Sequence, residues 1–119
     1  MARGDDISRR LRQFAARVVR LCRELPNDVA ARHINRQLIR SGTAGGANYE
    51  EARGAESRAD FIHKLSIANK EVRESLYWLK LIEDAELSDS GLEDLEREAN
   101  ELVAILTSSI KTAKKKLAS

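Results

Sequence analysis

The sequence predicts an all-α fold, and three observations support this prediction. Apolar residues recur at helical spacing in four long segments, the chain contains one proline, and no segment alternates with the two-residue period of a strand. Apolar residues make up 42% and charged residues 34% of the 119 residues, which is typical of a soluble helical protein. This length suits a single domain, so we assign residues 1–119 to one four-helix bundle.

The first helix is predicted over about residues 6–25. Pro26 ends it, because proline disfavours helical conformation at the preceding residue. Asn27 or Asp28 then caps a second helix, predicted over about residues 28–53. The apolar face of the first helix comprises Ile7, Leu11, Phe14, Val18, Leu21, Cys22 and Leu25.

The third and fourth helices each follow an apparent capping box. Gly54 interrupts the helical pattern, and Ser57 with Asp60 marks a third helix over about residues 57–84. Ser90 and Glu93 repeat the pattern before a fourth helix over about residues 90–117. Because the connections are short, neighbouring helices should be antiparallel, which gives an up-down-up-down bundle.

Composition also limits the compartment. No run of about 18 apolar residues is present, and the N-terminal residues lack the apolar core of a signal peptide. The single cysteine, Cys22, lies on the apolar face and is expected to be a small buried hydrophobe. We therefore expect a cytoplasmic protein.

The third helix carries apolar residues in two directions. Ile67, Trp78 and Leu81 lie more than about 90° from its core stripe on a helical wheel. A wide core face with some exposed apolar residues is one interpretation. We favour an oligomer interface, since tryptophan and leucine are frequent interface anchors. The predicted interface residues are Ile39, Gly46, Ile67, Trp78 and Leu81.

The segment LIRSGTAGGANYEEARG (38–54) holds four of the six glycines. It lacks the preceding strand and the following lysine of a phosphate-binding P-loop. Each glycine inside a helix costs about 1 kcal/mol relative to alanine, so close approach of another helix must compensate. Gly45 is predicted to face the bundle's own core, and Gly46 to face a second subunit.

An enzyme is not expected. A di-iron bundle requires two Glu-x-x-His motifs, whereas the nearest pattern here is a single Asp60-x-x-His63. No serine is paired with a histidine in the sequence, and Cys22 is expected to be buried. We expect no catalytic residues, no metal site and no cofactor.

Positive charge gathers on the first helix although the formal net charge is only +2. Four arginines fall within roughly 80° of each other and span on the order of 20 Å, enough for several phosphates. A solvated helix face is an equally weighted interpretation. The candidate nucleic-acid-binding residues are Arg9, Arg12, Arg20, Arg23, Lys114, Lys115 and Lys116.

The run QLIRSGTAGGANYEEARGAESRADFIHKLSIANKEVRESLYWLKLIEDAEL, from Gln37 to Leu87, carries a family resemblance. It closely resembles the four-helix-bundle proteins encoded in intervening sequences of bacterial 23S ribosomal RNA genes. This resemblance implies a homopentamer. It also implies kinship with the accessory variability protein of diversity-generating retroelements, which shares the fold and is thought to bind nucleic acid and a reverse transcriptase.

The resemblance further implies that Arg40, Asn48, Glu51 and Glu74 are the polar positions of the family pattern. We interpret them as a structural network at helix or subunit contacts, with a ligand site as the alternative. The leading functional hypothesis is a non-enzymatic oligomer that binds RNA or an RNA–DNA hybrid through phosphate contacts. The alternative is a protein-interaction scaffold or accessory subunit that does not itself bind nucleic acid.

Overall fold

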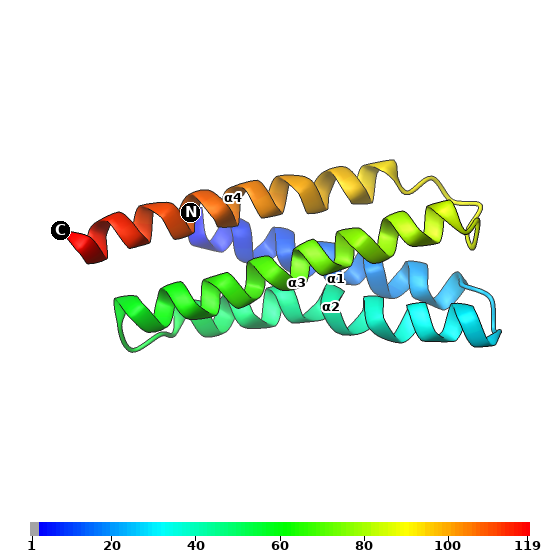
Figure 1. The fold of residues 1–119 in the computed structure, drawn as a ribbon, viewed down its shortest axis with the longest axis horizontal. Coiled ribbons are helices and arrows are strands. Elements are labelled where there is room, and N and C mark those ends of the chain that lie inside the picture. The colour runs from blue at the N-terminus through cyan, green and yellow to red at the C-terminus, as the bar shows by residue number, and fades with distance from the viewer. Residues whose placement is uncertain (1–2) are drawn as a thin grey trace.

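The structure, a computed structural model, describes residues 3–119 and contains four helices: α1 (Arg3–Glu24), α2 (Val29–Arg53), α3 (Arg58–Asp84) and α4 (Glu93–Ala118). Residues 1 and 2 of the predicted domain lie outside the described residues. Figure 1 shows an elongated antiparallel bundle, with principal dimensions of 51 × 24 × 21 Å. The all-α fold with four helices is confirmed, and α1 and α4 form the smallest of the helix–helix interfaces.

Two of the predicted helix caps are present. The Asp28 carboxylate accepts the backbone N–H of Ala31 at 2.9 Å, which begins α2. The Ser57 hydroxyl accepts the N–H of Asp60 at 3.0 Å, which begins α3. These side chains satisfy N–H groups that have no partner within the helix.

The predicted start of the fourth helix is wrong. Leu92 occupies the N-cap position of α4, and no side chain caps the helix. Ser90 instead donates its N–H to the Ser88 hydroxyl at 3.1 Å. Leu92 is only 4% exposed, so burial of its side chain in the core positions the start of α4. At the other end of the chain, α1 begins three residues earlier than predicted.

The predicted apolar face of α1 forms one side of the core. Leu11, Phe14 and Val18 are almost completely buried against the other helices. Cys22 is also buried, and removal from water raises the pKa of its thiol to about 11. The prediction of a buried, unreactive cysteine is confirmed in its structural part.

The glycines of α2 mark close helix contacts. A Cβ on Gly42 would lie 2.7 Å from Val18 of α1, and one on Gly45 would lie 2.8 Å from Val72 of α3. Gly45 thus faces the chain's own core, as predicted. The orientation predicted for Gly46 is wrong, because a Cβ there would meet Leu11 of the same chain at 3.4 Å. Gly46 thus lies at the contact between α1 and α2, and its role in an oligomer interface stays a prediction.

The described part of the chain contains no helix with the length and apolar character needed to cross a membrane.

Candidate nucleic-acid interface

The outer face of α1 carries exposed arginines at the predicted positions. Arg12, Arg20 and Arg23 are exposed, and among the described residues their guanidinium groups have no hydrogen-bond or ion-pair partner. Arg9 differs, because its guanidinium contacts Asp6 of the same helix at 2.6 Å. Part of the predicted stripe is therefore paired with an acid, and the remainder is open to solvent.

Arginines that face neighbouring helices are instead paired. Arg10 of α1 bonds Glu98 of α4 through two nitrogens, at 2.7 and 3.0 Å. These hydrogen bonds raise the pKa of Arg10 above its usual value. Arg53 of α2 bonds Asp5 of α1 at 2.6 Å. Arg12, Arg20 and Arg23 on the outer face of α1 thus differ from Arg10 and Arg53, whose guanidinium groups are held by acids on neighbouring helices.

The predicted lysines lie in the last turns of α4, which extend past the N-terminal end of α1 (Figure 1). All three are exposed. Lys114 lines a groove between α3 and α4, whereas Lys116 lines a separate depression beside Gly4 and Tyr49. The structure therefore does not gather Lys114, Lys115 and Lys116 on one surface.

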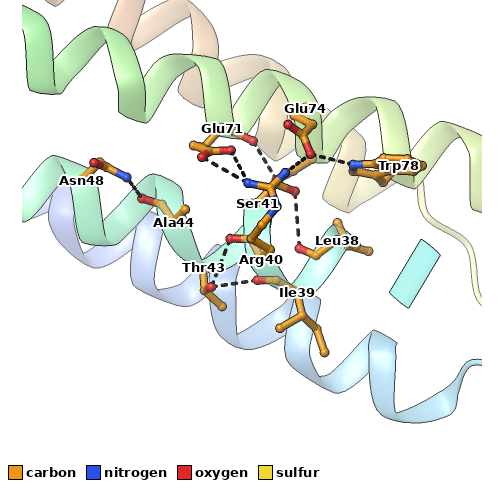
Figure 2. A network of polar contacts seen from close by, with 11 residues as sticks. Leu38, Ile39, Arg40, Ser41, Thr43, Ala44, Asn48, Glu71, Glu74 and Trp78 are labelled. Carbon is orange, nitrogen blue, oxygen red and sulfur yellow. Dashed lines mark hydrogen bonds and ion pairs between the residues drawn. The ribbon is translucent and has the colours of Figure 1, made fainter. Parts of the chain in front are cut away.

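Arg40 joins α2 to α3 through two carboxylates (Figure 2). Its guanidinium lies 3.1 Å from Glu71 and also bonds Glu74. The indole N–H of Trp78 donates to the same Glu74 carboxylate at 3.0 Å. The hydrogen bond from Trp78, followed by the contact with Arg40, lowers the pKa of Glu74 and keeps it ionised.

A second polar contact lies beneath this network. Ser41 and Ser75 are completely buried, and their hydroxyl oxygens are 2.9 Å apart. The Ser75 hydroxyl also lies 2.9 Å from the backbone oxygen of Glu71. Because both hydroxyls have partners, the burial of these polar groups is compensated.

The predicted polar set is only partly assembled. Arg40 and Glu74 are in contact, but Asn48 donates to the backbone oxygen of Ala44 in its own helix at 2.9 Å. The Glu51 side chain is 69% exposed, and its carboxylate lies 4.0 Å from the Lys64 amine. The interpretation of Asn48 and Glu51 as members of one network with Arg40 is wrong.

Glu71 and Trp78 belong to the Arg40 network and Ser75 to the contact beneath it, although the sequence-based set omitted all three. Together with Glu74 they follow the spacing i, i+3, i+4 and i+7 of one helix face. That spacing is the signal which identifies them once α3 is known to face Arg40.

The residues predicted to form an oligomer interface have different environments. Ile39 is 39% exposed, and Ile67 is half-buried. Trp78 and Leu81 pack against the core of their own chain. Both side chains cover the edge of the core and remain partly exposed, so their role in an oligomer interface stays a prediction.

The sequence profile of the family described as 23S rRNA-intervening sequence protein matches residues 5–108. The chain belongs to this family. A crystal structure of another protein supports the same assignment: a protein with unknown function from the S23 ribosomal protein family of Bacteroides thetaiotaomicron VPI-5482. It is 37% identical, with a TM-score of 0.82, and the match covers 92% of this chain and 99% of that one.

Among curated proteins, none matches the chain significantly. The chain thus belongs to the 23S rRNA-intervening sequence family, and the solved relative has the same fold. The function of that relative is unknown.

Proposed function

We propose that this protein is a non-enzymatic nucleic-acid-binding bundle that contacts the phosphates of RNA or an RNA–DNA hybrid through the outer face of α1. One observation carries the proposal. Arg12, Arg20 and Arg23 are exposed without a carboxylate partner in the described range, whereas Arg10 and Arg53 are paired across helix interfaces.

The guanidinium groups of these three arginines have N–H donors that no described residue accepts. A guanidinium has five N–H donors in a planar fork that matches two phosphate oxygens. Arg12 and Arg23 are eleven residues apart, which corresponds to roughly 16 Å along a helix. Phosphate contacts position the nucleic-acid backbone without reading the bases, so binding should be largely independent of the nucleotide sequence.

The test is a filter-binding titration of a labelled RNA–DNA hybrid at several salt concentrations. Replacing Arg12, Arg20 and Arg23 with glutamine should weaken binding at low salt. The slope of log affinity against log salt concentration should also become shallower, by roughly 0.7–0.9 for each lost phosphate contact. Helix content, measured by circular dichroism, should not change.

A single-residue comparison controls for net charge. Arg20→Glu and Arg97→Glu change the charge equally, but Arg97 lies on α4 and is paired with Asp94 at 2.8 Å. Only Arg20→Glu should weaken the hybrid complex by more than a few-fold. Equal effects of the two variants, or wild-type affinity that is indifferent to salt, would contradict the proposal.

We also propose that the chain associates with copies of itself, in the pentamer that the family resemblance implies. Ile39 supports this, because this large apolar side chain in the middle of α2 is 39% exposed. Burial of a fully exposed isoleucine contributes about 1.5–3 kcal/mol, so several symmetric copies of a half-exposed one would stabilise an assembly appreciably.

Val29 provides the matched control for this association. It is 78% exposed at the first position of α2. In light scattering, Ile39→Glu should lower the mass of the particle, and Val29→Glu should leave it unchanged. A monomeric wild-type protein at micromolar concentration would refute the association.

A further inference from the structure

The open groove between α3 and α4 has a volume of about 680 Å³. Its cationic lining comes from both helices: Lys70 and Arg73 from α3, and Lys111 and Lys114 from α4. All four side chains belong to exposed residues. The groove therefore concentrates positive charge between the middle of α3 and the C-terminal half of α4.

Little negative charge opposes these cations. Within the described residues, Arg73, Lys111 and Lys114 have no carboxylate within 4 Å. Glu74 is the one acid in the lining, and its carboxylate already bonds Arg40 and Trp78. An anion in the groove would therefore meet cations whose charge is not already neutralised by an ion pair.

The bottom of the groove has hydrogen-bonding groups. The Asn69 amide donates to the Thr107 hydroxyl oxygen at 3.1 Å and so links α3 to α4. The Oδ1 atom of Asn69 is buried without a hydrogen-bond partner. The Thr107 hydroxyl still has its own proton to donate, which suits an oxygen acceptor such as a phosphate.

An exposed aromatic ring continues the α3 side of the groove. Tyr77 follows Arg73 by one helical turn and is 59% exposed. It lies edge-on to Trp78, with ring centroids 5.0 Å apart. Ser66, Lys70, Arg73 and Tyr77 fall within roughly 60° on the surface of α3, so the ring and the cations form one stripe.

We propose that this groove binds single-stranded nucleic acid, with the lysines and Arg73 on successive phosphates and Tyr77 stacked on one base. Packed helices lie only about 8–10 Å apart, so the groove between them can hold one strand but cannot admit a duplex. Stacking on a side chain also requires a base that is not already stacked in a duplex. This inference rests on the proposed binding of nucleic acid, and it assigns a different face and strand state from the outer face of α1.

The first experiment compares two charge-matched double variants by fluorescence anisotropy. Arg73→Glu/Lys111→Glu alters the groove, and Arg12→Glu/Arg20→Glu alters α1. The probes are a labelled 12-nucleotide oligouridylate and a 12-base-pair RNA–DNA hybrid. We expect the groove variant to lose at least tenfold in oligouridylate affinity and little in hybrid affinity, while the α1 variant shows the opposite pattern.

Each result separates the two proposals. Equal loss of oligouridylate affinity in both variants would overturn the groove assignment, because net charge alone would then explain binding. Loss of hybrid binding in the α1 variant, with no groove effect, would leave the proposed function standing and refute the groove. Wild-type protein that binds neither probe in low salt would overturn both.

The second experiment tests the aromatic contact. Tyr77→Ala should weaken oligouridylate binding roughly 5- to 100-fold, as expected for loss of one stacked base, whereas Tyr77→Phe should retain it. Trp78, the single tryptophan and a neighbour of Tyr77, should change its fluorescence on binding. If Tyr77→Ala has no effect and polyglutamate competes as well as RNA, the groove is a general polyanion site and the single-strand proposal is wrong.

Discussion

The Cγ1 atom of Val18 lies 2.7 Å from the position that a Cβ would occupy on Gly42. Carbon atoms in van der Waals contact lie about 3.5–4.0 Å apart, so only glycine permits α1 to approach α2 this closely. This close approach compensates for the cost of a glycine in the interior of a helix, and it distinguishes Gly42 from Gly46, whose Cβ would lie 3.4 Å from Leu11.

Gly42→Ala should therefore destabilise the protein although alanine favours helix. The methyl group must displace Val18, a β-branched side chain with little rotamer freedom. Overpacking of this kind costs about 1–3 kcal/mol, which exceeds the gain in helix propensity of about 1 kcal/mol. Urea unfolding followed by circular dichroism measures the difference.

Gly46→Ala is the matched control, because its Cβ would make an ordinary contact with Leu11. We expect it to be neutral or stabilising, by up to about 1 kcal/mol. Val18→Ala in the Gly42→Ala background should restore part of the lost stability. If Gly42→Ala and Gly46→Ala have equal effects, the close contact with Val18 is not what requires glycine.

Trp78→Phe should lower stability at pH 7 by about 1–2 kcal/mol, since it removes the hydrogen bond to a charged carboxylate but keeps an aromatic ring. The bond lowers the pKa of Glu74 in the folded state from its usual 4.5. The stability that this hydrogen bond contributes is therefore fully present above pH 4.5, and it is lost as the pH falls through the lowered pKa of Glu74. Denaturant unfolding at several pH values should show the two proteins converging in acid.

Tyr77→Phe serves as the control for this prediction, because it removes a hydroxyl from an exposed neighbouring ring and should leave the unfolding curve unchanged. A constant difference between wild type and Trp78→Phe across the acid range would mean that packing, rather than the bond to Glu74, accounts for the loss. Trp78→Glu is expected to destabilise the fold itself, because the indole packs against the core.

Glu96→Gln should stabilise the protein at neutral pH. Burial, and then repulsion from Glu83, raise the pKa of Glu96 above 4.5 in the folded state. The folded protein then retains a proton that the unfolded chain loses, so this group makes stability fall as the pH rises from 4.5 through the raised pKa. The amide carries no charge to desolvate, and the gain should disappear below pH 4.5.

Thermal unfolding at pH 4 and pH 7 provides the measurement. Glu93→Gln is a suitable comparison, because Glu93 is exposed at the start of α4. There the carboxylate interacts favourably with the helix dipole, so its removal should be neutral or slightly destabilising. Equal stabilisation by both substitutions would argue against the burial of Glu96 as the cause.

Glu86→Gly should stabilise the connection after α3. Glu86 has φ of 55°, and among non-glycine residues within 3–119 it is the one with positive φ. Its neighbour Leu87 donates a backbone hydrogen bond to Ile82 at 3.0 Å, which is the pattern of a helix end that favours glycine. Glycine has no Cβ to be strained in the left-handed conformation. The substitution should therefore increase the free energy of unfolding by about 0.5–1 kcal/mol, after subtraction of the entropy cost of glycine.

Glu86→Ala separates backbone conformation from charge. It removes the same carboxylate but retains a Cβ, so the unfolding free energy should increase much less than in Glu86→Gly. If alanine stabilises as much as glycine, repulsion among the acids near the end of α3 is the cause, and the backbone argument is wrong.

Local features of the sequence specify the four helices and their order. Pro26 and the caps at Asp28 and Ser57 act within one helical turn, and the apolar spacing of α1 specifies which side enters a core. These are short-range effects, so they can be read from neighbouring residues. The exposed arginines of α1 were predictable for the same reason, since they lie opposite its apolar face.

The groups that meet across helices depend instead on how the helices pack together. Leu92 begins α4 because its side chain is buried, although Ser90 has the better capping chemistry. Gly46 lies against Leu11 because α1 crosses α2 there, and the α3–α4 groove exists because Arg73 and Lys111, distant in sequence, line one surface. Each outcome depends on the rotation of one helix against another, which is set by packing of the whole core rather than by local spacing.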